Sequence, residues 1–70
     1  MSPKTYPTLT LASQTCAQLA GDDCETGPDG SAVESELEGG WSFIPVDMEG
    51  GYWIERRCEH GNFMGYHGTD

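Results

Sequence analysis

The stretch Trp41-Ser-Phe-Ile-Pro-Val-Asp-Met-Glu-Gly-Gly-Tyr-Trp-Ile-Glu-Arg-Arg57 decides the fold, because it holds two runs of aromatic and β-branched residues around a paired-glycine turn signal. Similar signals stand at Glu38-Gly39-Gly40 and at residues 59–62, about ten residues apart. The runs between these signals therefore predict the strands of an antiparallel meander: residues 41–47, 52–58 and 63–67.

Alternation within these runs gives the predicted sheet two different faces. Phe43 and Pro45 share one face of the first run, whereas Ile44 and Val46 share the other. Both faces carry large apolar side chains, so the N-terminal part must cover one of them. The other is predicted to be a dimer face or a partner-binding surface. Pro45 cannot donate a ladder hydrogen bond, which predicts an edge or a bulge at that position.

Residues 8–20 have two interpretations. In the first, Thr8–Leu11 is a short strand and Ser13–Ala20 is a helix with Ser13 as its N-cap. In the second, one helix begins at Thr8, and its apolar stripe comprises Leu9, Ala12, Cys16, Leu19 and Ala20. The predicted fold class is α+β: a short N-terminal strand and helix packed on a three- or four-stranded antiparallel β-meander, in a single small domain of residues 1–70.

The segment Ser31–Glu38 also has two interpretations. Ser31-Ala-Val-Glu34 fits a capping box, and Val33 and Leu37 lie one turn apart, which favours a short helix that ends at Gly39. The same residues alternate between acidic and other side chains, which favours a strand. We prefer the strand, because eight residues are few for a helix. Upstream, the Gly- and Pro-punctuated acidic segment 21–30 is predicted to be an exposed loop.

The charge of the chain is concentrated in one segment. The formal net charge is -9, and nine of the twelve carboxylates fall within residues 21–49, which contain no Lys or Arg. Such a segment speeds association with a positively charged surface and repels nucleic acid and anionic membranes. Direct binding to nucleic acid or to a membrane is therefore disfavoured. We prefer a dedicated basic partner to the alternative, an acidic surface present only for solubility.

If residues 31–38 form a strand, Glu34, Glu36 and Glu38 project from one face about 6.8 Å apart. Lys and Arg side chains that grip a phosphate backbone would accept this row in place of phosphates, as they do with a nucleic-acid mimic. In charge balance and size the chain resembles the small acidic inhibitors that phages make against host defence nucleases, including anti-CRISPR proteins. We therefore predict an inhibitor of a basic, nucleic-acid-gripping protein surface, with these partner-binding residues: Asp22, Asp23, Glu25, Asp29, Glu34, Glu36, Glu38, Asp47, Glu49, Tyr52 and Trp53.

A second hypothesis is a zinc-stabilised structural or interaction module. Its ligands would be Cys16, Cys24, Cys58 and His60, which are suitable residue types. Their spacing lacks the C-x2-4-C knuckles of zinc ribbons and fingers, so the three cysteines are expected to be free thiols. We predict no cofactor. We also predict no enzymatic activity, because the sequence supplies no oxyanion hole or protected cleft for a nucleophile and base.

The start of the chain bears on its location. The first ten residues have neither a basic region followed by an apolar core nor a run long enough to span a bilayer. We therefore expect a cytoplasmic protein. A chain of 70 residues buries only about 60% of its unfolded surface, so a homodimer would add stability that one core lacks.

Overall fold

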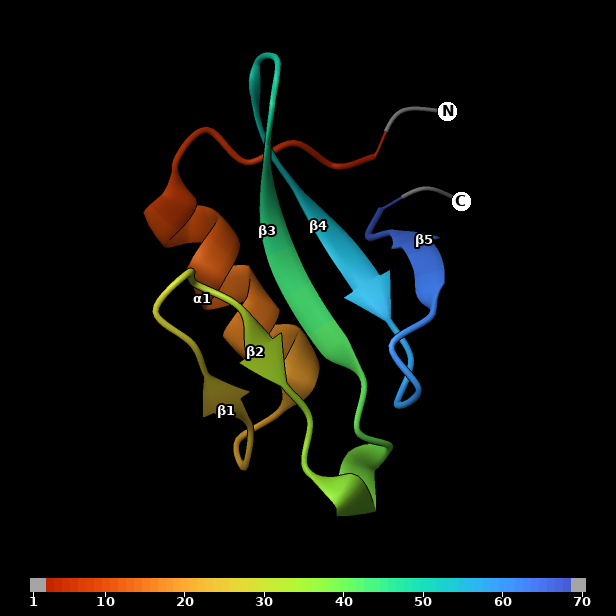
Figure 1. Ribbon diagram of the computed structural model, residues 1–70. Coiled ribbons are helices and arrows are strands. Elements are labelled where there is room, and N and C mark those ends of the chain that lie inside the picture. Colours follow the sequence, from red (N-terminus) through yellow and green to blue (C-terminus); the bar gives the residue numbers. More distant parts are fainter. Residues whose placement is uncertain (1–2, 69–70) are drawn as a thin grey trace.

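The computed structural model describes residues 3–68, which form one helix packed against an antiparallel five-stranded sheet of order β1-β2-β3-β4-β5 (Figure 1). This confirms the predicted α+β meander with a covering helix. The sheet has five strands where three or four were predicted, because two very short strands precede the long hairpin. The elements are α1 Leu9–Ala20, β1 Glu25–Thr26, β2 Ala32–Val33, the 3-10 helix η1 Glu36–Glu38, β3 Ser42–Met48, β4 Gly51–Arg57 and β5 Phe63–Tyr66.

The hairpin of β3 and β4 is the framework of the sheet. Met48 pairs with Gly51, so the turn between the strands consists of Glu49 and Gly50. Gly51 has a φ of 145°, and a Cβ there would lie 2.5 Å from the carbonyl oxygen of Tyr6. Glycine is needed at this position because the N-terminal segment crosses close by. Tyr6 and Tyr52 exchange backbone hydrogen bonds of 2.9 and 2.8 Å there.

Helix α1 agrees with the second interpretation of residues 8–20, in which one continuous helix begins at Thr8. Thr8 is its N-cap, and the Thr8 hydroxyl accepts a hydrogen bond of 3.2 Å from the backbone N–H of Leu11. The predicted strand at Thr8–Leu11 and the predicted N-cap at Ser13 are therefore wrong. The helical spacing of the apolar stripe outweighs the local alternation of Thr and Leu. Among the described residues before the helix, extended pairing is limited to the single Tyr6–Tyr52 bridge.

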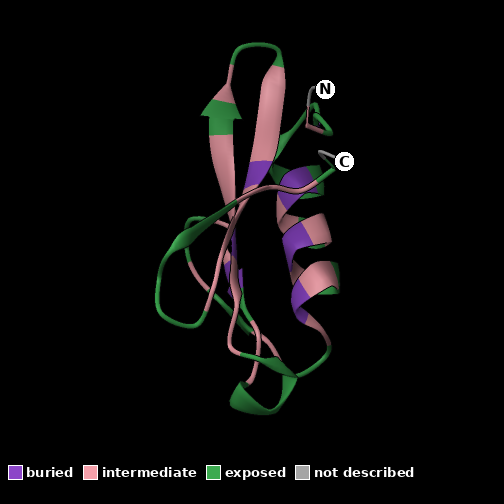
Figure 2. Ribbon diagram, turned by 90° about the vertical axis from the view of Figure 1, so that its right-hand side faces the viewer, coloured by how far each residue is buried: buried purple, intermediate pink, exposed green. Residues whose placement is uncertain are grey.

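Small side chains join the helix to the sheet. Ala12, Cys16 and Ala20 recur at every fourth position of α1, and all three are buried. They allow α1 to lie close to the sheet, where Phe43 and the fully buried Ile54 contribute the large apolar side chains. In Figure 2 the buried positions lie where the helix and the sheet face each other, so α1 covers one face.

The predicted long strand over Ser31–Glu38 is wrong. Pairing with β3 stops at Val33, and η1 follows after two residues. Glu34 closes the intervening loop: its backbone N–H donates to the carbonyl oxygen of Trp41 (2.8 Å), and its Oε1 accepts from the N–H of Trp41 (3.0 Å). The loop returns through Gly39 and Gly40, which have φ values of 122° and 73°. These positive values favour glycine and turn the chain away from the strand direction.

Pro45 lies where the sequence predicted an edge. The partner strand β2 ends opposite Ser42 and Phe43, so β3 is paired only with β4 at Pro45. The missing N–H therefore costs no hydrogen bond to β2. The segment around Gly30 packs here instead, because a Cβ at Gly30 would lie 3.3 Å from Cγ of Pro45. Of the helices within residues 3–68, none has the length and apolar character needed to cross a membrane.

Candidate partner-binding site

In Figure 2 the helix lies against one face of the sheet, and no helix of the described residues lies against the other. The strand register places several apolar side chains on that second face. Phe43 and Ile54 are buried under the helix, so their neighbours Ile44 and Trp53 point to the other side. Val46 pairs directly with Trp53 and lies on the same side. Val33 lies on the same side of β2, opposite Ser42 in the register, and is 39% exposed.

The aromatic side chains on this second face are ordered by ring contacts. The ring centroids of Trp53 and Tyr66 are 5.1 Å apart at an interplanar angle of 72°. Those of Tyr66 and Phe63 are 5.2 Å apart at 70°. These edge-to-face contacts attach the short strand β5 to β4 and hold Trp53 in one orientation. We call the set Val33, Ile44, Val46, Trp53, Phe63 and Tyr66 the open face.

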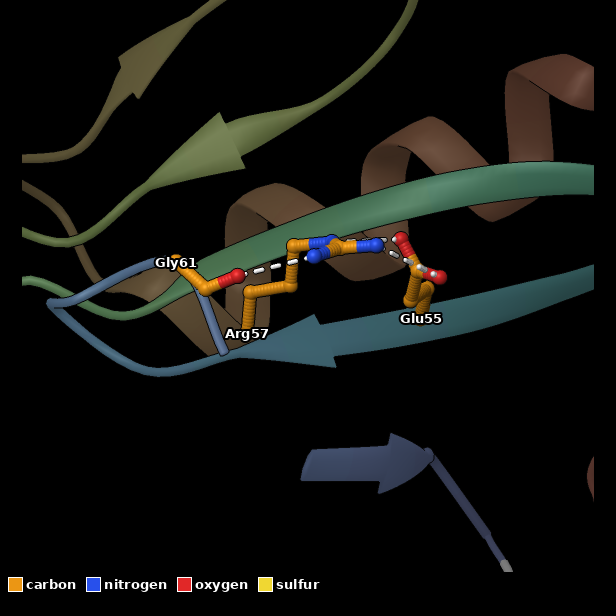
Figure 3. A network of polar contacts seen from close by, with 3 residues as sticks. All are labelled: Glu55, Arg57 and Gly61. Carbon is orange, nitrogen blue, oxygen red and sulfur yellow. Dashed lines mark hydrogen bonds and ion pairs between the residues drawn. The ribbon is translucent and has the colours of Figure 1, made fainter. Parts of the chain in front are cut away.

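An ion pair lies among the side chains of the open face (Figure 3). Glu55 pairs with Ile44 on one side and with Tyr66 on the other, and Arg57 pairs with Phe63. Nε of Arg57 is 2.9 Å from Oε2 of Glu55, and Nη1 of the same guanidinium donates to the carbonyl oxygen of Gly61 at 2.8 Å. The side chain thus connects the β4–β5 turn to the strand before it. Because Arg57 is neutralised in this way, it leaves the negative charge of the rest of the molecule unopposed.

The other basic residues are also engaged within the fold. Nη2 of Arg56 donates to the carbonyl oxygen of Met64 at 3.0 Å, across the irregular pairing between β4 and β5. Nζ of Lys4 lies 5.7 Å from the ring centroid of Tyr6. None of the ion pairs found within residues 3–68 involves a carboxylate of the acidic segment 21–49.

The nine carboxylates of that segment do not form the predicted single row. Eight are exposed, and Glu34 is half-buried because it closes the loop to Trp41. Figure 1 shows the β3–β4 turn and η1 at opposite ends of the molecule, whose longest extent is 34 Å. The exposed carboxylates thus fall into three groups: Asp47 and Glu49 at the hairpin end, Glu36 and Glu38 at the η1 end, and Asp22, Asp23, Glu25 and Asp29 around β1.

Asp29 has a defined hydrogen-bond geometry. Its Oδ1 accepts from the Ser31 hydroxyl at 2.6 Å and from the Ser31 backbone N–H at 3.0 Å. Both bonds favour the charged carboxylate, so they lower the pKa of Asp29 below its ordinary value. The two hydrogen bonds close the β1–β2 turn and favour a negative charge on Asp29 at the β1 edge of the sheet.

The two predicted aromatic residues have different positions. Tyr52 packs against the core beneath α1 and pairs with Tyr6, whereas Trp53 lies on the open face. The sequence prediction missed Tyr66, Phe63 and Val33 as companions of Trp53. The period-two alternation identified Ile44 and Val46, but the register of the short strands was needed to add the others.

One apolar side chain stands apart from the open face. Leu37 is 98% exposed and lies between Glu36 and Glu38 in η1. The backbone N–H groups of Glu38 and Gly40 both donate to the carbonyl oxygen of Ser35, which fixes this turn.

The cysteines do not support the zinc hypothesis. Cys16 is buried in the helix–sheet interface, and desolvation, followed by the nearby charge of Asp29, raises its pKa to about 11. A thiol must lose its proton to bind zinc, which this environment opposes. Cys24 and Cys58 are half-buried free thiols, and His60 is exposed beside Glu59. In the part of the chain that the structure describes, no three His, Cys, Asp or Glu side chains are grouped to hold a metal ion.

A shallow hollow of about 360 Å³ lies between α1 and the β1–β2 turn. Leu9, Ser13 and Gln14 line it from the helix, and Gly27, Pro28 and Gly30 line it from the turn. Its lining residues include no cysteine, histidine or carboxylate.

Comparison with protein-family models, with curated proteins and with solved structures finds no match for this chain. The function must therefore be argued from the open face and the exposed carboxylates.

Proposed function

We propose that this chain is an antagonist that binds a basic, nucleic-acid-gripping surface of another protein and blocks it. The observation that carries the proposal is the state of the charges. Eight of the nine carboxylates in segment 21–49 are exposed, and the described ion pairs neutralise none of them. The three basic side chains are meanwhile engaged within the fold.

An exposed excess of negative charge has a defined physical effect. It speeds encounter with a cationic surface and opposes association with nucleic acid. Self-repulsion also destabilises the compact state, so an unneutralised excess is favoured where a basic partner relieves it. By analogy with small acidic phage inhibitors of defence nucleases, including anti-CRISPR proteins, the proposed target is a nucleic-acid-binding protein or complex in the cytoplasm.

The arrangement of the charges refines the mode of binding. A row of closely spaced glutamates on one strand would imitate a single run of phosphates. The carboxylates instead lie at two ends and one edge of the molecule. The antagonist therefore engages separated cationic patches and excludes nucleic acid sterically between them.

A displacement assay tests the proposal. Fluorescent duplex DNA is bound to a panel of guide-loaded defence nucleases, and the chain is added at low and high salt. Displacement from at least one nuclease is expected, and it should weaken as salt rises because the Debye length falls from about 10 Å at 0.1 M to about 3 Å at 1 M.

A variant that carries both triple substitutions, Glu36→Gln/Glu38→Gln/Glu49→Gln and Asp22→Asn/Asp23→Asn/Glu25→Gln, should lose displacement by at least about tenfold. Circular dichroism of this variant confirms folding. No displacement across the panel, or displacement that neither salt nor the substitutions alter, would refute the antagonist and leave the charge a role in solubility.

A further inference from the structure

We infer that the open face is the docking surface, and that its partner is a protein surface with an apolar centre flanked by two cationic patches. That the partner is positively charged follows from the proposed function, and this inference rests on that proposal. The location of the docking surface rests on the sheet: one face is covered by α1, and no helix of the described residues lies against the other.

The open face has the composition of an interface core. Trp53 lies beside Val46 across the hairpin and is held by the ring of Tyr66. Tryptophan and tyrosine are the residues that most often dominate binding energy, because their large rings are desolvated together. The ring contacts already fix the orientation of Trp53, so little side-chain entropy remains to be lost on binding.

Acidic residues stand beyond both ends of this face. Glu49 lies in the turn at the hairpin end, and Glu36 and Glu38 lie at the η1 end. Asp47 is also near the hairpin end, but it pairs with Tyr52 and lies on the α1 side of β3. Asp47 is five positions after Ser42 along β3, which corresponds to about 17 Å of strand, and η1 lies beyond Ser42. A partner that matches this arrangement carries Lys or Arg in two patches about 20 Å or more apart.

The same arrangement argues against a second copy as the occupant. In a symmetric dimer through the open face, the hairpin end of one copy lies over either the hairpin end or the η1 end of the other. Both ends are acidic, so either alignment brings carboxylates together. Each copy also carries a formal charge of -9. The predicted homodimer is therefore disfavoured on this face.

The test uses a designed helical peptide of about 20 residues, which is about 30 Å long. Its probe form has a central leucine stripe and three lysines at each end, and its control form has the same composition with the lysines in the centre. Binding to the 15N-labelled chain is followed by nuclear magnetic resonance. The probe is expected to shift the indole N–H of Trp53 and the amides of Ile44 and Val46, and to bind at least about tenfold more tightly than the control.

Three variants locate the contact. Val46→Lys places a cation in the apolar centre and should weaken probe binding at least tenfold, with an unchanged melting temperature as the sign of intact folding. Glu36→Gln/Glu38→Gln/Glu49→Gln should weaken binding more than Asp22→Asn/Asp23→Asn/Glu25→Gln, although both remove three negative charges. Probe shifts confined to residues 22–29, equal effects of the two triple variants, or a dimer in sedimentation that buries Trp53 would each overturn the inference.

The two proposals fail separately. If a nuclease is displaced but the probe binds around β1, the antagonist stands and the docking surface is wrong. If the probe binds the open face but no nuclease is displaced, the docking surface stands and the antagonist is wrong.

Discussion

The two faces of the same hairpin have opposite roles in this protein. Toward α1, the sheet presents Phe43 and Ile54 to a helix surface of small residues, and the contact is closed to solvent. Away from α1, the sheet presents Ile44, Val46 and Trp53, which remain half-buried. Adjacent residues of one strand thus contribute either to folding or to an accessible surface, according to the parity of their position.

The difference lies in what covers each face, since the strands have apolar side chains on both. The helix covers its face because Ala12, Cys16 and Ala20 allow close approach. Within residues 3–68, no other helix presents a row of small side chains that packs on the open face. Aromatic residues lie on both sides of the sheet: Tyr6, Trp41, Phe43 and Tyr52 belong to the core or pack against it, whereas Trp53, Phe63 and Tyr66 lie on the open face.

The strongest way to break this comparison is to make the same substitution on both faces. Ile54→Ala removes a side chain that is 0% exposed and should destabilise the domain by about 2–5 kcal/mol. Ile44→Ala removes the same atoms from the half-buried open face and should cost about 1 kcal/mol. Urea unfolding followed by tryptophan fluorescence measures both. Equal losses would show that the open face is packed as tightly as the core.

A second comparison uses the helix side of the interface. Burial raises the pKa of Cys16 to about 11 from an ordinary 9.0, so the folded state holds the thiol proton more tightly than the unfolded state. The resulting stability is fully present below about pH 9 and is lost as pH rises toward 11, by an amount on the order of 2 kcal/mol.

Urea midpoints at neutral and alkaline pH check this expectation. Cys16→Ala should remove this part of the alkaline loss, whereas Cys58→Ala, at a half-buried site, should retain it. Iodoacetamide at pH 8 should modify Cys58 well before Cys16. Rapid modification of Cys16 in the folded protein would show that the helix–sheet interface is open.

A third comparison contrasts two glutamates of the same segment. Glu34→Ala removes the acceptor for the N–H of Trp41 and should cost about 1 kcal/mol, with faster hydrogen exchange at that amide. Glu36→Ala, at an exposed position, should change stability by less than about 0.5 kcal/mol. If the two variants behave alike, Glu34 belongs with the solvated carboxylates and does not fix the loop.

The sequence was sufficient to predict the meander and its two faces. Gly-containing turn signals and period-two alternation located the β3–β4 hairpin, and they placed Phe43 and Ile44 on opposite sides. It also identified Ala12, Cys16 and Ala20 on the apolar side of α1, although the predicted stripe member Leu9 is 43% exposed and the N-cap was wrongly preferred at Ser13. Ser is slightly preferred to Thr at N-caps, so local propensity alone favoured Ser13 over the actual N-cap, Thr8.

The arrangement of the acidic residues could not be predicted. Residues 31–38 alternate like a strand, but the two hydrogen bonds between Glu34 and Trp41 bend the segment into a loop. Those bonds join residues seven positions apart and depend on positive φ values at Gly39 and Gly40. A tertiary arrangement of this kind outweighs an eight-residue pattern. The predicted row of glutamates was lost for this reason.

The smallest expected effect lies in the turn between β1 and β2, at an exposed carboxylate. The Ser31 hydroxyl and N–H lower the pKa of Asp29, so the charged carboxylate is favoured more in the folded state than in the unfolded state. This stability is present above the ordinary Asp pKa of about 3.9 and is lost as pH falls through the lower folded value. Ser31→Ala should raise the pKa of Asp29 in a carboxyl nuclear magnetic resonance titration and flatten the acid side of the stability profile.

Ser35→Ala is the matched control, because Ser35 makes no side-chain cap hydrogen bond and should leave the pKa of Asp29 unchanged. The change in stability should be the smallest of the four, because water screens a fully exposed carboxylate. An Asp29 pKa that ignores Ser31→Ala would show that the turn does not hold this charge, and that the edge group of carboxylates is solvated throughout.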